Sequence, residues 1–273
     1  MNLRAAGPGW LFCPADRPER FAKAAAGADV VILDLEDGVA EADKPAARKA
    51  LRETQLDPDR TVVRINAADT DEQARDLDAL AGTAYTTVML SKTESAAQVT
   101  ALAPRDVVAL VETPRGVVFA AEIAAAEGTV AMMWGAEDLV ATLGGSSSRQ
   151  ADGTYRDVAR HVRSTILLAA SAFGRIALDA VHLEIRDIEG LQVEANDAVA
   201  VGFHGTVCIH PTQIPVVRKA YRPSEEKLDW ARRVLAAAQT ERGVFAFEGQ
   251  MVDSPVLKHA EMMLRRVGES ASG

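Results

Sequence analysis

The sequence predicts an α/β protein built as a (β/α)8 barrel, the TIM barrel fold, with a C-terminal helical arm. We place the barrel at residues 1–222 and the arm at residues 223–273. The prediction rests first on short apolar, β-branched runs that alternate with helical stretches eight times along the chain. Most of these runs are continuously apolar, as in parallel strands that are covered on both faces. The length of 273 residues also suits the fold, because α/β barrels routinely use about 250 residues as a single domain.

Each strand-like run is followed by a stretch with helical patterning. The runs lie at 10–13, 30–34, 61–65, 86–90, 107–111, 129–134, 176–180 and 206–209. The helical stretches lie at about 17–26, 45–54, 71–80, 94–102, 115–126, 155–173, 188–200 and 212–220. A doubly wound open sheet gives the same alternation but often carries a Gly-rich fingerprint after its first strand, whereas this chain has CPAD at 13–16. A segment rich in Gly and Ser at 144–153 follows the sixth run and predicts a mobile active-site loop.

The arm begins where Arg222 and Pro223 break the chain after the eighth unit. Ser224 can cap a helix that reaches about residue 240. A short segment at 247–249 then precedes a last helix, which opens at 253–255 and reaches about residue 266. We therefore predict a helical extension added to the barrel.

Composition excludes several classes of function. The formal charge is −9, and the sequence contains no cluster of Lys and Arg residues. Both features argue against nucleic acid or an anionic membrane as a partner. The N-terminal residues 1–10 lack an apolar signal core, and no apolar run approaches the roughly 20 residues that span a bilayer. We expect a soluble cytoplasmic protein. Cys13 and Cys208 form neither a metal knuckle nor a disulfide framework, so we expect buried thiols.

Polar residues stand at the predicted carboxyl ends of the strands, where barrels of this kind hold their catalytic groups. They occur at 34–38, at Arg64 and Asn66, at 91–92, 112–114, 135–138 and 210–211. Carboxylates that several strands deliver to one rim repel one another unless a cation lies among them. The rim is therefore the predicted active site.

Glu112 and Asp138 follow neighbouring strands and predict a site for a hard divalent ion, Mg²⁺. This ion binds one or two protein carboxylates and completes its octahedron with water and substrate oxygens. The alternative is that either acid caps a helix or pairs with Lys92 or Arg64.

Three basic side chains at the rim leave alternatives open. Arg64 interrupts an apolar strand, so its guanidinium either bridges Glu36 or Asp37 or binds a substrate carboxylate, for which its planar fork is suited. Lys92 could form a Schiff base, but nearby acids would hold it protonated. His210 could be a ligand or a base, although a structural, hydrogen-bonding role is the simpler interpretation.

Six motifs, taken in order, resemble those of the citrate lyase β-subunit-like proteins in the malyl-CoA lyase and 2-keto-3-deoxy acid aldolase superfamily. The resemblance covers nearly the whole chain, from about residue 11 to residue 264. The motifs are LFCPA at 11–15, VILDLEDGV at 31–39, VRIN at 63–66, VETP at 111–114, WGAEDL at 134–139 and IHPTQI at 209–214. A tail segment, GQMVD at 249–253, is similar to the family's Gly-x-Met-x-Asp arm.

The resemblance implies a Mg²⁺-dependent enzyme that makes or breaks a carbon–carbon bond between a 2-keto acid and an acyl-CoA enolate. It implies that Glu112 and Asp138 bind the metal and that Arg64 binds the carboxylate of the keto acid. The Gly135-Ala136 backbone would line the same pocket. Asp253 would act as acid or base in the site of a neighbouring subunit, and we therefore expect a homo-oligomer, a trimer. The alternative is that Asp253 only caps the helix that follows it.

The predicted function is thus a carbon–carbon lyase acting on a 3-hydroxyacyl-CoA of the malyl-, citramalyl- or hydroxymethylglutaryl-CoA type. Two alternatives share the metal site. A citrate lyase β subunit would use a thioester on a carrier protein, and a metal-dependent 2-keto acid aldolase would use an aldehyde without needing Asp253. A barrel that only binds a metabolite would show no turnover with metal. The chain departs from the family pattern at two places, GPG at 7–9 and Thr206. These departures bear on whether the thioester is carried by free CoA or by a carrier protein.

Overall fold

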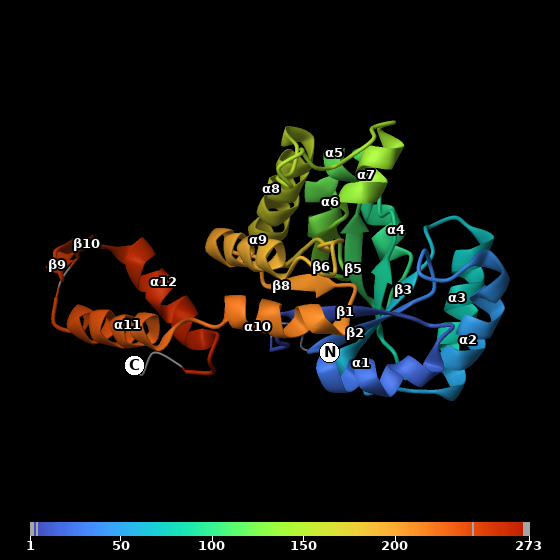
Figure 1. Cartoon of the computed structure of the whole chain (residues 1–273), viewed down its shortest axis with the longest axis horizontal. Coiled ribbons are helices and arrows are strands. Elements are labelled where there is room, and N and C mark those ends of the chain that lie inside the picture. Colours follow the sequence, from blue (N-terminus) through green and yellow to red (C-terminus); the bar gives the residue numbers. More distant parts are fainter. Residues whose placement is uncertain (1–2, 4, 242, 270–273) are drawn as a thin grey trace. The chain divides into compact units, whose positions relative to one another are not determined.

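The computed structural model describes residue 3, residues 5–241 and residues 243–269. In the described part of the chain, eight parallel strands close into a barrel in sequential order, and β1 completes the ring by pairing with β8 (Figure 1). The strands are β1 (Gly9–Pro14), β2 (Val30–Asp34), β3 (Thr61–Ile65), β4 (Thr87–Leu90), β5 (Asp106–Val111), β6 (Thr129–Trp134), β7 (Ile176–Asp179) and β8 (Gly205–Cys208). The predicted (β/α)8 barrel is confirmed, and an open sheet is excluded.

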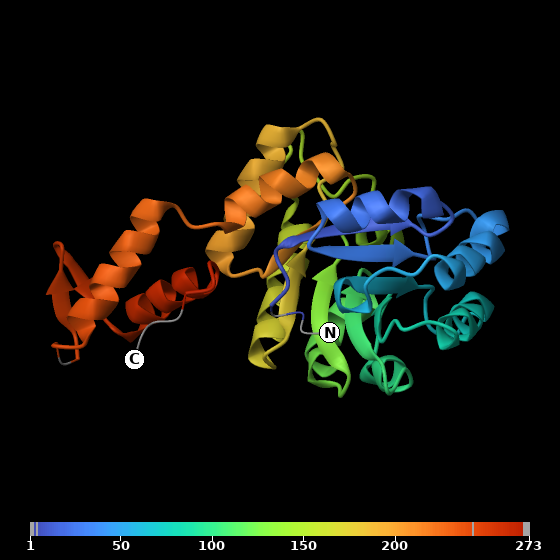
Figure 2. The same ribbon diagram turned by 90° about the horizontal axis from the view of Figure 1, so that it is seen from below.

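Helices follow the strands and cover the barrel. They are α1 (Phe21–Gly27), α2 (Lys44–Glu53), α3 (Asp71–Ala81), α4 (Ala96–Thr100), α5 (Pro114–Val118), α6 (Ala120–Ala125), α7 (Ala136–Thr142), α8 (Asp157–Ala172), α9 (Ile188–Val201) and α10 (Ile214–Tyr221). Short 3₁₀ turns, Pro18–Arg20, Glu41–Asp43, Pro58–Arg60 and Pro211–Gln213, precede α1, α2, β3 and α10. Figure 2 shows α1, in blue, lying along β1 and β2.

Two helix predictions need correction. The stretch predicted at 115–126 is two helices, because Phe119 leaves the helical conformation between α5 and α6 (φ −99°, ψ 15°). Helix α7 was not predicted, because its seven residues are too few to show a helical period. It begins directly after Gly135, so Asp138 lies in its first turn.

The barrel interior is apolar and receives side chains from all eight strands. These buried residues include Trp10, Val30, Ile32, Val62, Met89, Val108, Leu110, Ala131, Met133, Ile176, Leu178 and Val207. Along a strand they recur at every second position, as Val30 and Ile32 do, because successive strand side chains point to opposite faces. Polar groups are therefore concentrated at the strand ends, which is where the site forms.

The chain divides into two compact units, residues 1–218 and 219–273, whereas the predicted boundary lay at 222/223, after the end of α10. The second unit contains α11 (Glu225–Ala238), strands β9 (Phe245–Phe247) and β10 (Gln250–Val252), and α12 (Ser254–Arg265). Ser224 caps α11 as predicted, by accepting a hydrogen bond from the backbone N–H of Lys227.

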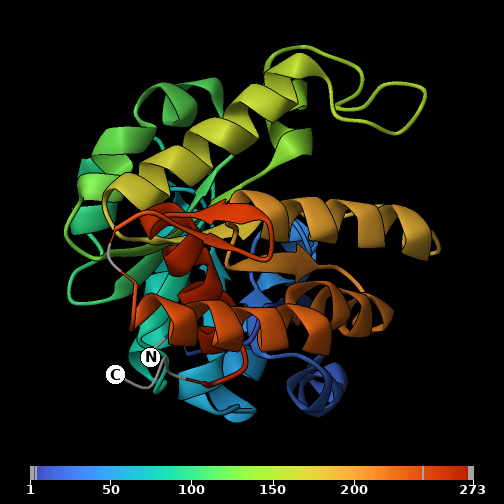
Figure 3. The ribbon, with the colours of Figure 1, turned by 90° about the vertical axis from the view of Figure 1, so that its left-hand side faces the viewer.

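The arm is not purely helical, because β9 and β10 form an antiparallel hairpin between its two helices (Figure 3). Three residues per strand are too few for a polarity alternation to be recognised in the sequence. The unit has its own apolar core, which includes Leu228, Val234, Val252, Met263 and Leu264.

Both cysteines are free and buried, as predicted. Burial raises the pKa of the Cys13 thiol to about 11 and the pKa of the Cys208 thiol to about 12, so both stay protonated at neutral pH. Among the described residues, none of the helices combines the length and the apolar character that a bilayer crossing demands.

Candidate active site

A pocket of about 100 Å³ opens at the carboxyl ends of the strands. Its lining comprises Phe12, Arg64, Leu110, Glu112, Met133, Trp134, Gly135, Ala136, Glu137, Asp138, Ala180 and Val181. Five of the six predicted site residues, namely Arg64, Glu112, Gly135, Ala136 and Asp138, therefore meet in one cavity. The sixth, Asp253, belongs to the second unit.

Glu112 directly follows β5 and lies deep in this pocket, with only 3% of its surface exposed. The backbone N–H of Lys92 donates to its Oε1 at 3.0 Å. Burial, and after it the negative charge of Asp138, raises the pKa of Glu112 to about 8. Gly135 permits this position, because a Cβ there would lie 2.6 Å from Glu112 Oε2.

Asp138 approaches Glu112 from the neighbouring strand. The register of β5 and β6 pairs Val111 with Trp134, so the turn after Trp134 brings Gly135 and then α7 beside Glu112. The Asp138 side chain is 37% exposed, and its Oδ1 lies 3.4 Å from Lys92 Nζ. Two carboxylates from adjacent strands thus face one cavity, one of them buried and the other open to solvent.

Arg64 forms a planar, two-pronged ion pair. Its Nε lies 2.7 Å from Asp34 Oδ1, and one terminal nitrogen lies 2.5 Å from Asp34 Oδ2. Its other terminal nitrogen lies 3.0 Å from Glu36 Oε2, and the guanidinium lies 4.6 Å from the centre of the Phe12 ring. Burial alone would lower the pKa of Arg64, but Asp34 and then Glu36 raise it, so the side chain is always charged.

The predicted bridge from Arg64 to Glu36 is present, but the predicted alternative partner Asp37 is wrong. Asp34 takes that place, because the β2–β3 register sets Asp34 directly opposite Arg64. The end of β2 is further held by Asp34, which accepts hydrogen bonds from the backbone N–H groups of Glu36 and Gly38, both at 2.9 Å. A Cβ at position 38 would lie 2.2 Å from Asp34 Oδ2, so only glycine fits there.

Lys92 lies among acids, as predicted. Its Nζ bonds Glu36 Oε1 and lies 3.3 Å from Asp37 Oδ2, in addition to Asp138. Burial alone would lower the pKa of Lys92, but Glu36, with Glu112 and Asp138 after it, raises it. A protonated amine is no nucleophile, which argues against a Schiff base. Its backbone is left-handed (φ 50°), a rare conformation for a non-glycine residue, and in this conformation its N–H points at Glu112.

His210 has a structural role, in line with the simpler interpretation. Its Nδ1 accepts a hydrogen bond from the backbone N–H of Thr212 at 3.3 Å and caps the turn Pro211–Gln213. The side chain of Gln213 completes the cap by accepting from the backbone N–H of His210 at 3.2 Å.

Sequence reasoning missed a second polar group beside the pocket. Trp134 Nε1 donates to Asp179 Oδ1 at 2.7 Å, and Arg163 pairs with Asp179 Oδ2 at 2.8 Å. Asp179 ends β7, and an acid at the end of an apolar run was the signal that could have identified it. Tyr155 packs edge-on against Trp134, with ring centres 5.1 Å apart.

The predicted loop at 144–153 is connected to this side of the pocket. Ser148 Oγ donates to Glu137 Oε1 at 2.6 Å, and Arg149 lies 3.9 Å from the centre of the Tyr155 ring. Arg149 and Tyr155 also form an isolated antiparallel bridge, so the segment turns back on itself before α8 (Figure 3). Its mobility stays a prediction.

Asp253 caps α12, the alternative that the sequence left open. Its Oδ1 accepts a hydrogen bond from the backbone N–H of Val256 at 3.3 Å. Capping occupies one carboxylate oxygen and fixes the direction of the group, and it is compatible with a role in proton transfer. The catalytic role of Asp253 stays a prediction.

The fold and the pocket together define a (β/α)8-barrel enzyme whose pocket at the carboxyl ends of the strands is lined by carboxylates and one arginine. Residues 9–211 match the HpcH/HpaI aldolase/citrate lyase family, and the chain belongs to it. It is a carbon–carbon lyase, and the family depends on Mg²⁺.

Two relatives and one solved structure are similar to this chain. A citrate lyase subunit beta-like protein of Mycobacterium tuberculosis is 83% identical over 272 residues, which cover 100% of both chains. The mitochondrial citramalyl-CoA lyase of Homo sapiens is 31% identical over 286 residues, covering 92% of this chain and 82% of its own. The crystal structure of the M. tuberculosis protein CitE in complex with magnesium, acetoacetate and coenzyme A has a TM-score of 0.94 at 83% identity. It covers 97% of this chain and 100% of that chain.

Proposed function

We propose that this protein is a Mg²⁺-dependent lyase that cleaves or forms a 3-hydroxyacyl-CoA from a keto acid and an acyl-CoA enolate. The observation that carries the proposal is the meeting of Glu112, Asp138 and Arg64 in one pocket. Two carboxylates suit a metal, and a guanidinium suits a substrate carboxylate. Similar proteins support this chemistry, because one is a citramalyl-CoA lyase and another forms a crystal complex with magnesium, acetoacetate and coenzyme A.

The residues present fit Mg²⁺. Glu112 is buried and its pKa is raised by burial and by Asp138, so a divalent cation would relieve the cost of ionising it. Both donors are hard carboxylate oxygens. In the described part of the chain, His, Cys, Asp and Glu side chains form no metal-binding group of three or more. A site with two carboxylates leaves the remaining positions to water and substrate oxygens, as Mg²⁺ prefers.

The two walls of the pocket suggest how the substrates bind. Arg64 Nε is occupied by Asp34, but the two terminal nitrogens carry two hydrogens each and make one contact each with an acid. They can therefore also bind the carboxylate of a keto acid. Phe12, Met133, Trp134, Ala180 and Val181 form an apolar surface against which the acyl chain of the thioester can pack.

In the synthetic direction, Asp253 of a neighbouring subunit takes a proton from the α-carbon of the thioester, and Arg64 orients the keto acid. Bound Mg²⁺ supplies a Lewis acid at the keto carbonyl. Gly135 leaves room for the Glu112 carboxylate, Gly135 and Ala136 line the pocket beside it, and the apolar wall excludes water from the enolate. The enolate carbon then attacks the keto carbonyl carbon, and the resulting alkoxide takes up a proton to give the 3-hydroxyl group. In cleavage the hydroxyl loses its proton, the carbon–carbon bond breaks, and Asp253 returns a proton to the enolate carbon.

In this proposal the barrel, residues 1–222, binds the metal and the keto acid, and the arm, residues 223–273, supplies Asp253. Because Asp253 would serve a neighbouring site, we propose a homo-oligomer, specifically a homotrimer. The cytoplasmic location of the protein also stays a prediction.

The function is tested by incubating the purified protein and Mg²⁺ with malyl-CoA, citramalyl-CoA and 3-hydroxy-3-methylglutaryl-CoA. Cleavage releases acetyl-CoA with glyoxylate, pyruvate or acetoacetate respectively, so the keto acid identifies the substrate. A chelator should stop the reaction and added Mg²⁺ should restore it. Cleavage that persists in chelator contradicts the proposal.

A second candidate, a citrate lyase β subunit acting on a carrier-protein thioester, is favoured by the name of the relative that is 83% identical. It predicts that free CoA esters turn over poorly and that other subunits co-purify. A metal-dependent 2-keto acid aldolase would instead condense pyruvate with an aldehyde and would tolerate Asp253→Asn.

A further inference from the structure

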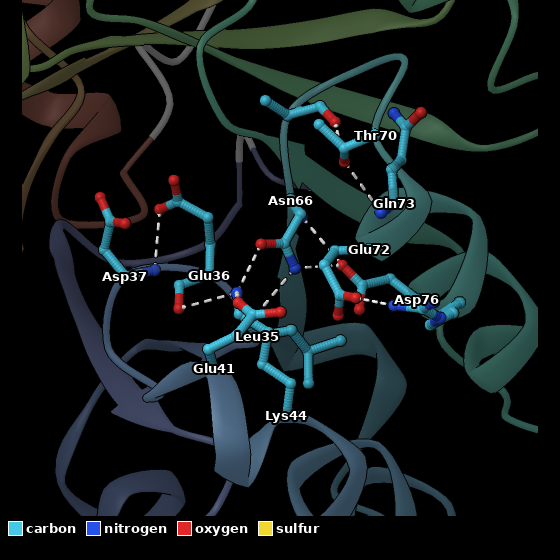
Figure 4. Close-up of polar contacts among 12 residues, drawn as sticks. Leu35, Glu36, Asp37, Glu41, Lys44, Asn66, Thr70, Glu72, Gln73 and Asp76 are labelled. Carbon is cyan, nitrogen blue, oxygen red and sulfur yellow. Dashed lines mark hydrogen bonds and ion pairs between the residues drawn. The ribbon is translucent and has the colours of Figure 1, made fainter.

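A network of buried polar side chains lies directly behind the end of β2 and outside the pocket. It consists of Lys44 on α2, Asn66 after β3 and Asp76 on α3, with Arg48 and Glu72 at its outer end (Figure 4). Asp76 is fully buried, and Lys44 and Asn66 are buried with it. None of the three lines the pocket.

The bonds of Asn66 fix its amide in one orientation. Its Oδ1 accepts from Lys44 Nζ at 2.6 Å, while its Nδ2 donates to Asp76 Oδ2 at 2.7 Å and to the carbonyl of Leu35 at 3.0 Å. Its backbone N–H donates to the same Asp76 oxygen at 2.9 Å. Figure 4 shows Asn66 between Lys44 and Asp76, and a flipped amide would set donor against donor at Lys44.

Lys44 carries the network to the backbone of the site loop. Its Nζ donates to the carbonyls of Leu35 at 3.1 Å and Glu36 at 3.4 Å, besides Asn66. The three ammonium hydrogens therefore have three acceptors inside the protein, two of which are consecutive peptide carbonyls. Both peptides at the end of β2 are held from behind.

The side chain of Glu36 connects these peptides to two cations of the site. Its carboxylate contacts Arg64 and Lys92, and Lys92 in turn donates to Glu112 through its backbone N–H. A continuous series of bonds therefore runs from α3, through Asp76, Asn66 and Lys44, to the Glu36 peptide and then to the two cations of the site.

We propose that Lys44, Asn66 and Asp76 are positioning residues that hold Glu36, and through it Arg64 and Lys92, in the geometry that the reaction needs. The role in the reaction rests on the proposed function, whereas the positioning of Arg64 does not. Burying a lysine and a carboxylate away from water is costly unless each is fully hydrogen-bonded, and here each is. Partners of this kind behind a metal or substrate site commonly change activity about 10- to 100-fold when removed.

The test variant is Lys44→Met, which keeps the apolar stem and removes the three donated bonds. Its matched control is Tyr85→Phe, which removes the hydroxyl that accepts from the backbone N–H of Leu56 at 2.7 Å. Tyr85 is also buried but precedes β4, at the opposite end of the strands. Asp76→Asn serves as a second variant with almost unchanged volume, in case Lys44→Met fails to fold.

The deciding measurement is a ¹⁵N–¹H spectrum of the arginine side chains, in which the Arg64 Nε–H signal is assigned by its absence in Arg64→Lys. The signal should shift or broaden in Lys44→Met and in Asp76→Asn but not in Tyr85→Phe. An Arg64 signal that stays in place in both folded variants overturns the proposal, whatever happens to their activity.

Kinetics then test the role in the reaction. Lys44→Met should lower kcat/KM for the keto acid about tenfold, with the KM of the thioester unchanged, while Tyr85→Phe keeps wild-type values. In a Glu36→Gln background, Lys44→Met should add little, because the two changes act on the same connection. Full additivity in this cycle contradicts the proposed route. A wild-type protein that cleaves none of the thioesters refutes the proposed function, and the Arg64 signal still decides whether the network positions Arg64.

Discussion

The two sides of the pocket hold their charges in opposite ways. On the β2–β3 side, Arg64 lines the cavity and its ion partners Asp34 and Glu36 hold it there. On the β6–β7 side, the ion pair of Arg163 and Asp179 lies outside the lining, and Trp134, which belongs to the lining, donates its indole N–H to Asp179. Both sides hold an arginine–aspartate pair, but of the two arginines only Arg64 lines the cavity.

Under the proposed function, this difference would let one rim bind two unlike substrates. A guanidinium with spare donors attracts an anion, whereas the indole N–H of Trp134 and the guanidinium of Arg163 are already bonded to Asp179. In the proposed function, Arg64 on the β2–β3 side suits the keto acid, whereas Met133, Ala180 and Val181 suit the acyl chain, and the metal candidates Glu112 and Asp138 lie between them at the ends of β5 and β6. The following predictions test this comparison, from the largest expected effect to the smallest.

Glu112→Gln should abolish Mg²⁺ binding, because an amide cannot replace the buried carboxylate as a ligand. Turnover should fall by more than about 100-fold, which exceeds the usual effect of removing a residue that only hydrogen-bonds to a metal ligand. Calorimetric titration with Mg²⁺ measures the first effect and thioester cleavage the second. Glu122→Gln, on α6, is a surface control that should behave as wild type. Mg²⁺ binding of normal affinity in Glu112→Gln would rule out this ligand.

Asp253→Asn should leave Mg²⁺ and keto acid binding intact and lower turnover about 10²- to 10⁴-fold, since the amide is no base. Neither side of the pocket supplies this group. Mixing Asp253→Asn with Arg64→Ala should restore part of the activity, because some interfaces then combine an intact aspartate with an intact arginine. No rescue in mixtures shown to exchange subunits, or a fully active monomer, contradicts action in trans.

Arg64→Lys should lower kcat/KM for the keto acid about 10- to 100-fold, because the charge remains but the planar fork is lost. Arg163→Lys is the matched change on the apolar side. It should reduce stability through its lost bonds to Asp179 but leave the KM of the keto acid unchanged. Equal effects of the two variants on that KM would remove the distinction between the sides.

Trp134→Phe should raise the KM of the thioester a few-fold and leave that of the keto acid unchanged. It removes one hydrogen bond to Asp179, which should cost about 1–2 kcal/mol of unfolding free energy. Steady-state kinetics with each substrate varied in turn, together with thermal unfolding, measure both effects. A change in the KM of the keto acid alone would mean that the keto acid, and not the thioester, binds on the Trp134 side of the pocket.

The smallest effect concerns pH. Burial, followed by Asp138, raises the pKa of Glu112 from 4.5 to about 8. The group therefore stabilises the fold fully below about pH 4.5, and this contribution is lost as the pH rises through about 8. In chelator, Glu112→Gln should be more stable than wild type near pH 9, by on the order of 1 kcal/mol or a few degrees in Tm, with no gain near pH 4.5. If the unfolding free energies of wild type and Glu112→Gln depend on pH in the same way, Glu112 ionises in the folded protein without an energetic cost.

Much of the site could be predicted because parallel strands end at one edge of a barrel. Arg64, Glu112 and Asp138 each follow or interrupt an apolar run, and the closed ring brings such residues together whatever their separation in sequence. The strands themselves were recognisable because they are buried on both faces. The predicted runs at 30–34, 61–65 and 129–134 coincide with β2, β3 and β6.

The sequence by itself thus determined the barrel and the chemical types at its rim, since apolar periodicity and strand-end polarity are local properties of the chain. Only the tertiary structure decided which partner each charge has. Asp34 rather than Asp37 binds Arg64 because of strand register, and Lys44 reaches Asn66 because two helices pack behind one loop. Such pairings depend on distances of a few ångströms between segments far apart in the chain, and no local pattern encodes them.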